Sequence, residues 1–165
     1  MTFGHLGGSR LTIGMALLFI ALPSAAQQET HGHEADGGHH QYAVAGFIGS
    51  TRAHGENEFT LGVEFGYHLN SRWSIGAVFE RAERERHTSL LLAGVGWHPF
   101  GPALRFQLAA GIKDPSGTTE AVLRTGVGYE MELDNGWFIK PYLAADFISN
   151  EDTEGVFGLY IGRGF

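Results

Sequence analysis

The chain has 165 residues, which suits one domain, and 18 acidic residues outnumber 11 basic ones, for a formal net charge of −7. This negative balance argues against a nucleic-acid partner, because a phosphate backbone would be repelled. Cysteine is absent, so no disulfide bond can stabilise an exported form of the chain.

Residues 1–26 have the pattern of a secretory signal peptide. Arg10 is the only formally charged side chain in this segment, and an apolar run over 11–22 follows it. Pro23 and three small residues then lead to a cleavage site that we predict after Ala26. The apolar run is shorter than the roughly 20 residues of a spanning helix, and no other run approaches that length, which excludes a helical membrane protein.

Residues 27–41 contain no large apolar side chain and cannot contribute to a core, so we predict a flexible segment on the periplasmic side. Imidazole is a common ligand of zinc and copper. The segment is therefore a candidate site for Zn or Cu through His31, His33, His39 and His40. The spacing matches no defined structural zinc site. A soluble tail that happens to be rich in histidine is the simpler interpretation.

From Tyr42 onward, large apolar residues alternate with small or polar ones, as along 59–69, and turn signals such as Asp134-Asn135-Gly136 separate the segments. Each segment has about the 9–11 residues of a tilted strand that crosses a bilayer. Their number is even, as in bacterial single-chain barrels. We predict eight strands, over 42–51, 57–69, 72–82, 88–98, 103–113, 120–133, 137–148 and 154–165.

Which face of these strands points outward separates a membrane barrel from a soluble, lipocalin-like carrier. Eight strands enclose a space just wide enough for side chains, so aromatic residues turned inward would overfill it. Lipid accommodates the apolar face, and small residues inside let a narrow barrel close. We therefore predict an all-β protein, an eight-stranded antiparallel up-and-down transmembrane β-barrel over 42–165, preceded by a cleaved signal peptide.

Aromatic residues collect at both ends of the predicted strands, as the two membrane interfaces select. If the N-terminus is periplasmic, one end holds Tyr42, Tyr67, Trp73, Trp97, Phe100, Trp137 and Phe165. The other end holds Phe47, Phe59, Phe79, Phe147 and Phe157.

The signal peptide, the eight alternating strands and the terminal aromatic residue resemble the small outer-membrane barrels of the OmpA transmembrane-domain and OmpX type. The resemblance covers essentially all of 42–165 and implies location in the cell outer membrane. It also implies that the barrel-assembly machinery recognises the last strand through Phe157, Leu159, Ile161 and Phe165. Arg163 departs from the family's pattern, and Pro141 predicts a bulge or distortion in the seventh strand.

The alternation places charged residues of both signs in the lumen. The acidic residues are Glu64, Glu80, Glu130, Glu132 and Asp146, and the basic residues are Arg105, Lys113, Arg124 and Lys140. Isolated buried charges are too costly, so these groups must pair. We predict a ladder of ion pairs that plugs the barrel, formed by Glu64, Glu80, Arg105, Arg124, Glu130, Lys140 and Asp146. A gated path for an ion or small solute is the alternative.

Two further groups bear on function. His68 and His98 point inward near the mouth beside the His-rich segment, where they are candidates to assist metal binding. His87 and Ser89 are two residues apart, as in lipid A deacylases, but the Asn that follows the serine in that family is replaced by Leu90. We therefore predict a monomer that is not an enzyme, with a structural or interaction role in the envelope and with outer-membrane lipids and lipopolysaccharide as partners. Metal binding, a narrow path and lipid modification remain the alternatives.

Overall fold

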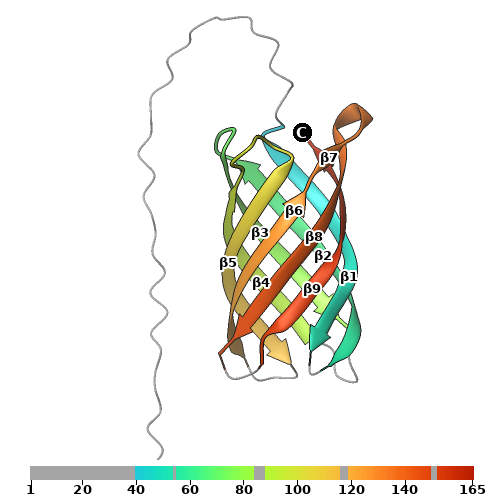
Figure 1. The fold of residues 1–165 in the computed structure, drawn as a ribbon, viewed down its shortest axis with the longest axis vertical. Coiled ribbons are helices and arrows are strands. Elements are labelled where there is room, and N and C mark those ends of the chain that lie inside the picture. The colour runs from blue at the N-terminus through green and yellow to red at the C-terminus, as the bar shows by residue number, and fades with distance from the viewer. Residues whose placement is uncertain (1–39, 54, 84–87, 116–118, 150–151) are drawn as a thin grey trace, which may run out of the picture. The chain divides into compact units, whose positions relative to one another are not determined.

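The computed structural model describes residues 40–53, 55–83, 88–115, 119–149 and 152–165, which form a closed antiparallel β-barrel (Figure 1). The predicted signal peptide and His31, His33 and His39 lie outside the described residues. Within these ranges, no helix is both long enough and apolar enough to cross a membrane.

The strands follow the predicted segments closely. Their bounds are β1 Tyr42–Ala53, β2 Glu56–His68, β3 Trp73–Ala82, β4 Thr88–Trp97, β5 Leu104–Pro115, β6 Glu120–Tyr129, β7 Met131–Glu132, β8 Trp137–Ile148 and β9 Glu154–Gly164. From β1 to β6 each strand pairs with the next in sequence, β8 pairs with β6, β7 and β9, and β1 pairs with β9 to close the barrel. β6 and β7 together are the predicted sixth strand, which is interrupted at Glu130, so the wall of the barrel consists of eight strands. The predicted eight-stranded antiparallel barrel is therefore confirmed.

Pro141 interrupts the ladder without adding a residue to it. Gly128 pairs with Tyr142 and Met131 pairs with Ile139, so the register is the same on both sides of the gap. The predicted bulge in the seventh strand is therefore wrong, since β8 runs unbroken from Trp137 to Ile148. The neighbouring strand changes instead, because Pro141, which this register places opposite Tyr129, has no N–H to donate to it, and the ladder is interrupted there. The N–H of Glu130 still bonds to the carbonyl oxygen of Ala103 on its other side, at 2.6 Å.

Both chain ends of the described barrel meet at one rim, which we call the terminal end. The N–H of Tyr42 donates to the carbonyl oxygen of Phe165 at 3.2 Å, and the N–H of Phe165 donates back at 2.8 Å. At this rim the turn before β8 uses Asn135 (φ 59°) and Gly136 (φ 77°), the left-handed conformation that the predicted Asp-Asn-Gly signal favours. The opposite rim, at the lower edge of Figure 1, is the far end.

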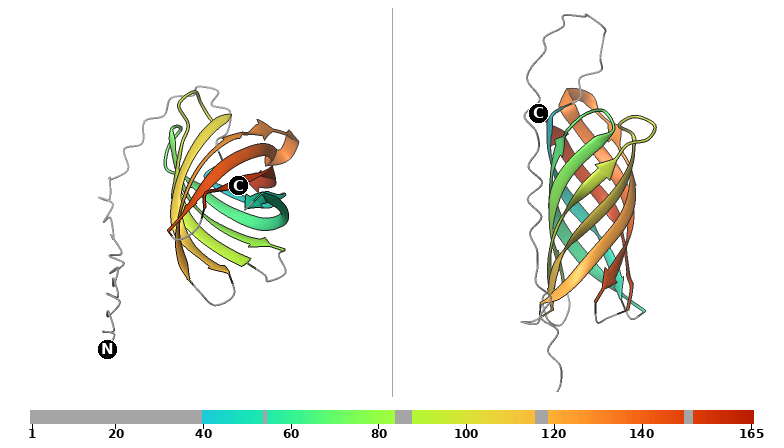
Figure 2. Two further views of the ribbon diagram at one scale, coloured as in Figure 1. Left: turned by 60° about the horizontal axis from the view of Figure 1, so that its bottom comes forward. Right: turned by 90° about the vertical axis from the view of Figure 1, so that its left-hand side faces the viewer.

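The strands are tilted relative to the barrel axis (Figure 2). Their exterior is apolar. Large outward side chains keep about half of their surface exposed, as with Val63 at 53%, Leu143 at 59% and Phe65 at 51%. A soluble protein would bury these groups, whereas a bilayer accepts them.

Aromatic residues concentrate at the terminal end, as predicted. The rings of Trp73 and Trp97 lie 6.5 Å apart on paired positions of β3 and β4, and the rings of Tyr42 and Tyr67 lie 5.1 Å apart. The outward position predicted for Phe47 is wrong. Its side chain is only 2% exposed and points into the lumen.

Inward glycines let the strands curve tightly around a narrow lumen. A Cβ atom added at Gly111 would overlap the carbonyl oxygen of Leu91, and one at Gly94 would overlap that of Leu108. A larger residue at either position would therefore require the backbone to move. Glycine at these two positions allows the close approach of β4 and β5.

Candidate functional site: the lumen and its mouths

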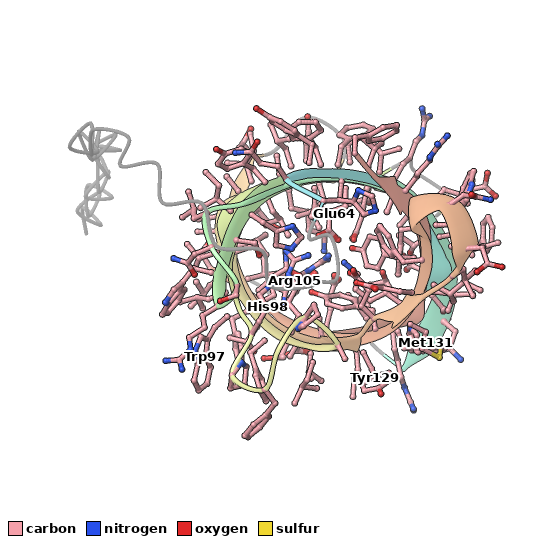
Figure 3. All side chains as sticks on the ribbon, turned by 90° about the horizontal axis from the view of Figure 1, so that it is seen from above. Glu64, Trp97, His98, Arg105, Tyr129 and Met131 are labelled. Carbon is pink, nitrogen blue, oxygen red and sulfur yellow. The ribbon has the colours of Figure 1, made fainter. Side chains whose placement is uncertain are left out.

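Ion pairs fill the lumen, and most of them join strands that are not neighbours in the barrel. Nearest the terminal end, Glu64 on β2 accepts hydrogen bonds from Arg105 on β5 and, at 3.0 Å, from Lys140 on β8. All three side chains are buried. Figure 3, which looks into the barrel from the terminal end, shows Glu64 and Arg105 directed inward, with Trp97, Tyr129 and Met131 outside the ring.

A second cluster lies deeper and centres on Arg124 of β6. Its guanidinium donates two hydrogen bonds to Glu80 on β3, at 2.6 and 2.8 Å, and two to Asp146 on β8, at 2.6 and 2.7 Å. Arg124 is 1% exposed. Bidentate pairing on both sides satisfies the fork of the guanidinium almost completely, which is what a charge so deep in protein requires.

A third pair occupies the lumen toward the far end. Lys113 on β5 donates to Glu154 on β9 at 2.7 Å. The sequence analysis did not identify Glu154 as a lumen residue. Val156 and Tyr160, which lie two and six residues after it on the same strand, point inward, so alternation places Glu154 inside as well. Which acid meets which base depends on the stagger of the strands, and that cannot be read from alternation.

Aromatic side chains separate the first two clusters. Phe47, Tyr142 and Tyr160 pack together with ring centroids 4.7 to 6.4 Å apart. The Lys140 ammonium lies 4.5 Å from the centre of the Tyr160 ring, while the Tyr160 hydroxyl donates to Glu80 at 3.5 Å. Tyr160 therefore contacts both clusters and, being fully buried, closes the space between them.

Two of the predicted lumen acids lie elsewhere. Glu132 is exposed, because β7 has only β8 as a neighbour and that hairpin is open to water, so its predicted position inside the lumen is wrong. Glu130 is half-buried at the terminal mouth and has no ion-pair partner among the described residues. The other predicted lumen charges all take part in ion pairs: Glu64, Glu80, Asp146, Arg105, Lys113, Arg124 and Lys140.

Histidines line the terminal mouth. His98, directly after β4, is buried, and its Nδ1 lies 3.3 Å from the carbonyl oxygen of Pro102 while its Nε2 lies 3.1 Å from the Ser74 hydroxyl. Burial, reinforced by the nearby Arg105 charge, lowers the pKa of His98 to about 4. The ring is therefore neutral, with Nδ1–H donating to Pro102 and Nε2 accepting from Ser74.

His68 and His40 complete this mouth. The His68 ring lies 5.5 Å from that of His98, and its Nδ1 is 2.9 Å from the carbonyl oxygen of His40. His40 packs against Gly136 and Gly164, beside a hollow that is open to solvent. Within the described ranges, no three His, Cys, Asp or Glu side chains are placed to hold a metal ion. Of the predicted metal ligands, only His40 is described.

Comparison with known proteins supports the fold. Neither a family model nor a curated protein matches the chain. The N-terminal β-barrel domain of Pseudomonas aeruginosa OprF is similar in structure, with 18% identity, a TM-score of 0.59, and coverage of 76% of this chain and 98% of that one. The Yersinia pestis outer membrane protein Ail is similar over 77% of this chain and 100% of its own, with 12% identity and a TM-score of 0.52.

The fold is that of a small outer-membrane β-barrel. Both similar structures come from proteins of this class, and the apolar exterior supports the predicted location in the outer membrane. At these identities the likeness concerns architecture, so the contents of this barrel have to be interpreted from its own residues.

The remaining candidate residues that the structure describes lie on the exterior of the barrel. Phe157 and Ile161 face outward on β9 at 47% and 46% exposure, Leu159 is half-buried between them, and Phe165 follows the strand at 63%. This ridge is the predicted assembly signal. Ser89 is half-buried on the outward face of β4, with Asp114 opposite it on β5, while His87 lies outside the described residues.

Proposed function

We propose that this protein is a plugged outer-membrane barrel whose role is structural, supporting the integrity of the envelope. The observation that carries the proposal is the Arg124 cluster, in which one fully buried guanidinium joins a carboxylate of β3 across the lumen to a carboxylate of the adjacent strand β8. An aromatic layer lies against it. Eight strands leave no open channel when side chains fill them in this way.

A strain that lacks the gene tests this role. We expect it to take up a large fluorescent dye and to become sensitive to detergent, and we expect the full chain to restore both barriers. The matched variant is Arg124→Met, which breaks the cluster and should restore them less well at equal abundance in the outer membrane. Full restoration by Arg124→Met, or no defect in the deletion strain, would contradict the proposal.

A narrow path for ions or small solutes is the alternative within the lumen, and it requires the clusters to separate. Fluorescent dye cannot detect it, but conductance across a planar bilayer can. Metal capture by His31, His33, His39 and His40 is a separate alternative. Its test is zinc or copper affinity of the chain with and without residues 27–40, where equal affinities would exclude the segment as the site.

Lipid modification is the third alternative, and we propose instead that the barrel is not an enzyme. Ser89 lies on the lipid-facing surface, where a lipid ester would be accessible, and Asp114 is its cross-strand neighbour. Release of fatty acid from lipid A by the purified full chain, lost in Ser89→Ala, would establish an enzyme. No release by either protein is the expected result.

A further inference from the structure

The lipid-facing positions of the described strands are almost free of charge. Arg52, Arg81, Asp114 and Arg163 are the charged residues that alternation and exposure place there. A charged side chain facing lipid costs roughly 2–4 kcal/mol at the midplane and much less near the interface. These residues lie near the ends of their strands, three at the far end and Arg163 at the terminal end, so each can extend toward the headgroups.

No carboxylate lies at the positions paired with Arg52. On β1 it pairs with Asn57 of β2 and with Gly155 of β9. Asn57 offers two amide N–H groups, and the guanidinium offers five. Gly155 adds no side chain, and a Cβ atom there would have nothing within 4 Å, so space remains next to Arg52.

Arg81 has a similar setting two strands away. On β3 it lies between Leu61 of β2 and Ser89 of β4, whose hydroxyl can donate. Phe79, two positions nearer the membrane centre on the same face, is 46% exposed. Neither Arg81 nor Arg52 has a carboxylate partner among the described residues. Asp114 is paired with Ser89 on the side away from Arg81. The backbones at Arg81 and Asp114 are therefore two strand spacings apart, about 10 Å.

We propose that Arg52 with Asn57, and Arg81 with Ser89, form two subsites for the phosphate groups of a phosphorylated lipid in the leaflet at the far end. A guanidinium presents paired N–H groups that match a phosphate, and at this depth a lipid headgroup is the anion that can reach both arginines. The inference rests on the proposed envelope role and deepens it, because it names the partner as a phosphorylated lipid.

Arg163 provides the matched control. It is also an exposed arginine on an outward strand position, but its guanidinium stacks on the Phe165 ring at 5.4 Å. Its cross-strand neighbours are Trp137 and Val44, which offer no comparable cluster of donors. Replacing Arg163 therefore removes the same charge from the same type of surface without removing a proposed subsite.

The test compares lipid retention by the purified full chain in detergent, measured by native mass spectrometry. The probes are lipid A with both phosphates and the same lipid after its phosphates have been removed. We expect the wild type to retain the phosphorylated lipid at least about tenfold better, as charge-assisted hydrogen bonds of this kind predict. The Arg52→Gln/Arg81→Gln variant should lose that preference, and Arg163→Gln should keep it.

Three results would overturn the inference: undiminished preference in the double variant, equal loss in Arg163→Gln, and displacement of the lipid by millimolar inorganic phosphate, which would indicate a site for free phosphate.

Folding of each variant is checked by the change in electrophoretic mobility on heating. If the double variant does not fold, Asn57→Ala and Ser89→Ala replace it, with an expected loss of two- to fivefold. Conductance of the barrel would contradict the plugged role and leave lipid retention intact, so the two failures are distinguishable.

Discussion

The lumen and the exterior of this barrel treat the same residue type in opposite ways. Arg124, inside, is 1% exposed and donates four hydrogen bonds to two carboxylates. Arg81, outside, is exposed and has no carboxylate partner among the described residues. A lumen this narrow holds little water, so a charge there must find its partner within the protein. A charge on the exterior must instead lie close to the headgroups.

The two surfaces therefore contribute differently to stability. Inside, the ion pairs of Glu64, of Arg124 with Glu80 and of Lys113 with Glu154 join strands that are not neighbours, so these pairs brace the barrel across its lumen, whereas Arg124 and Asp146 lie on adjacent strands. Outside, stability depends on the area of apolar surface that is covered by lipid and on the depth of any charged side chain in the bilayer. Substitutions chosen in matched pairs, one on each surface or at each depth, can test this difference.

The largest effect is expected for Arg124→Met, which leaves Glu80 and Asp146 buried without their cation. Loss of one partner from a buried cluster typically costs about 3–5 kcal/mol. Arg81→Gln should change the free energy of unfolding by less than about 0.5 kcal/mol, as surface substitutions do. Urea unfolding in lipid vesicles, followed by tryptophan fluorescence, measures both. Similar losses for the two variants would contradict the distinction between the surfaces.

Depth on the exterior is tested by Leu143→Arg against Leu133→Arg. The two leucines are similarly exposed, at 59% and 51%, but Leu143 lies in the middle of β8 and Leu133 lies between β7 and the turn at the terminal end. We expect Leu143→Arg to lower the free energy of unfolding by roughly 2–4 kcal/mol and Leu133→Arg by about 0–1 kcal/mol. A barrel that is not embedded in lipid would show no such dependence on depth in the same unfolding assay.

Glycine substitutions compare the inner face with the outer one. Gly111→Ala would force its Cβ against the backbone of Leu91, whereas Gly46→Ala faces outward and the nearest atom, the Ile161 carbonyl oxygen, is 4.0 Å away. Overpacking of this kind costs about 1–3 kcal/mol, and we expect Gly46→Ala to be close to neutral. Thermal unfolding of the two variants in the same detergent measures the difference, and a neutral Gly111→Ala would show that the inner face has spare room.

The smallest effect at neutral pH is expected at His98. Its pKa is about 4 in the folded barrel and near the ordinary 6.5 in the unfolded chain, so the unfolded chain binds more protons between these values. Stability should therefore fall as the pH drops from 6.5 toward 4 and should not depend on this group above 6.5. His98→Gln should reduce the slope in that window when unfolding is followed across pH. An unchanged slope would mean that His98 is protonated in the folded state.

Much of the fold could be predicted from the sequence. Each strand has one face toward lipid and one toward the lumen, so apolar and polar or small residues alternate along it with a period of two. The strand predicted over 137–148 has those limits in the structure, and the remaining strand ends differ by a few residues. Phe47 was placed wrongly because large rings were expected to face lipid, although its odd position on β1 points inward with Ala43 and Ala45. Glu132 lies at a position that alternation assigns to the inward face, but it is beyond the mouth of the barrel. Alternation does not indicate how far along the barrel axis a residue lies.

The pairing inside the lumen was less predictable. The sequence identifies which side chains point inward, but the partner of each depends on strand tilt and stagger, which bring β2 to β5 and β3 to β6 across the barrel. Glu64 takes two cations and Arg124 takes two acids, and the alternation of residues does not determine this arrangement. The aromatic layer was missed for a related reason, because large rings were expected to face lipid.

The most direct test of the sealed lumen is the conductance of the purified full chain in a planar bilayer at neutral pH. If the three ion-paired groups and the aromatic layer close the barrel as described, the wild type should give no resolvable current steps, and Arg124→Met should give steps or a raised baseline. Discrete, reproducible steps from the folded wild type would contradict the account, because they would show that ions pass the Arg124 cluster.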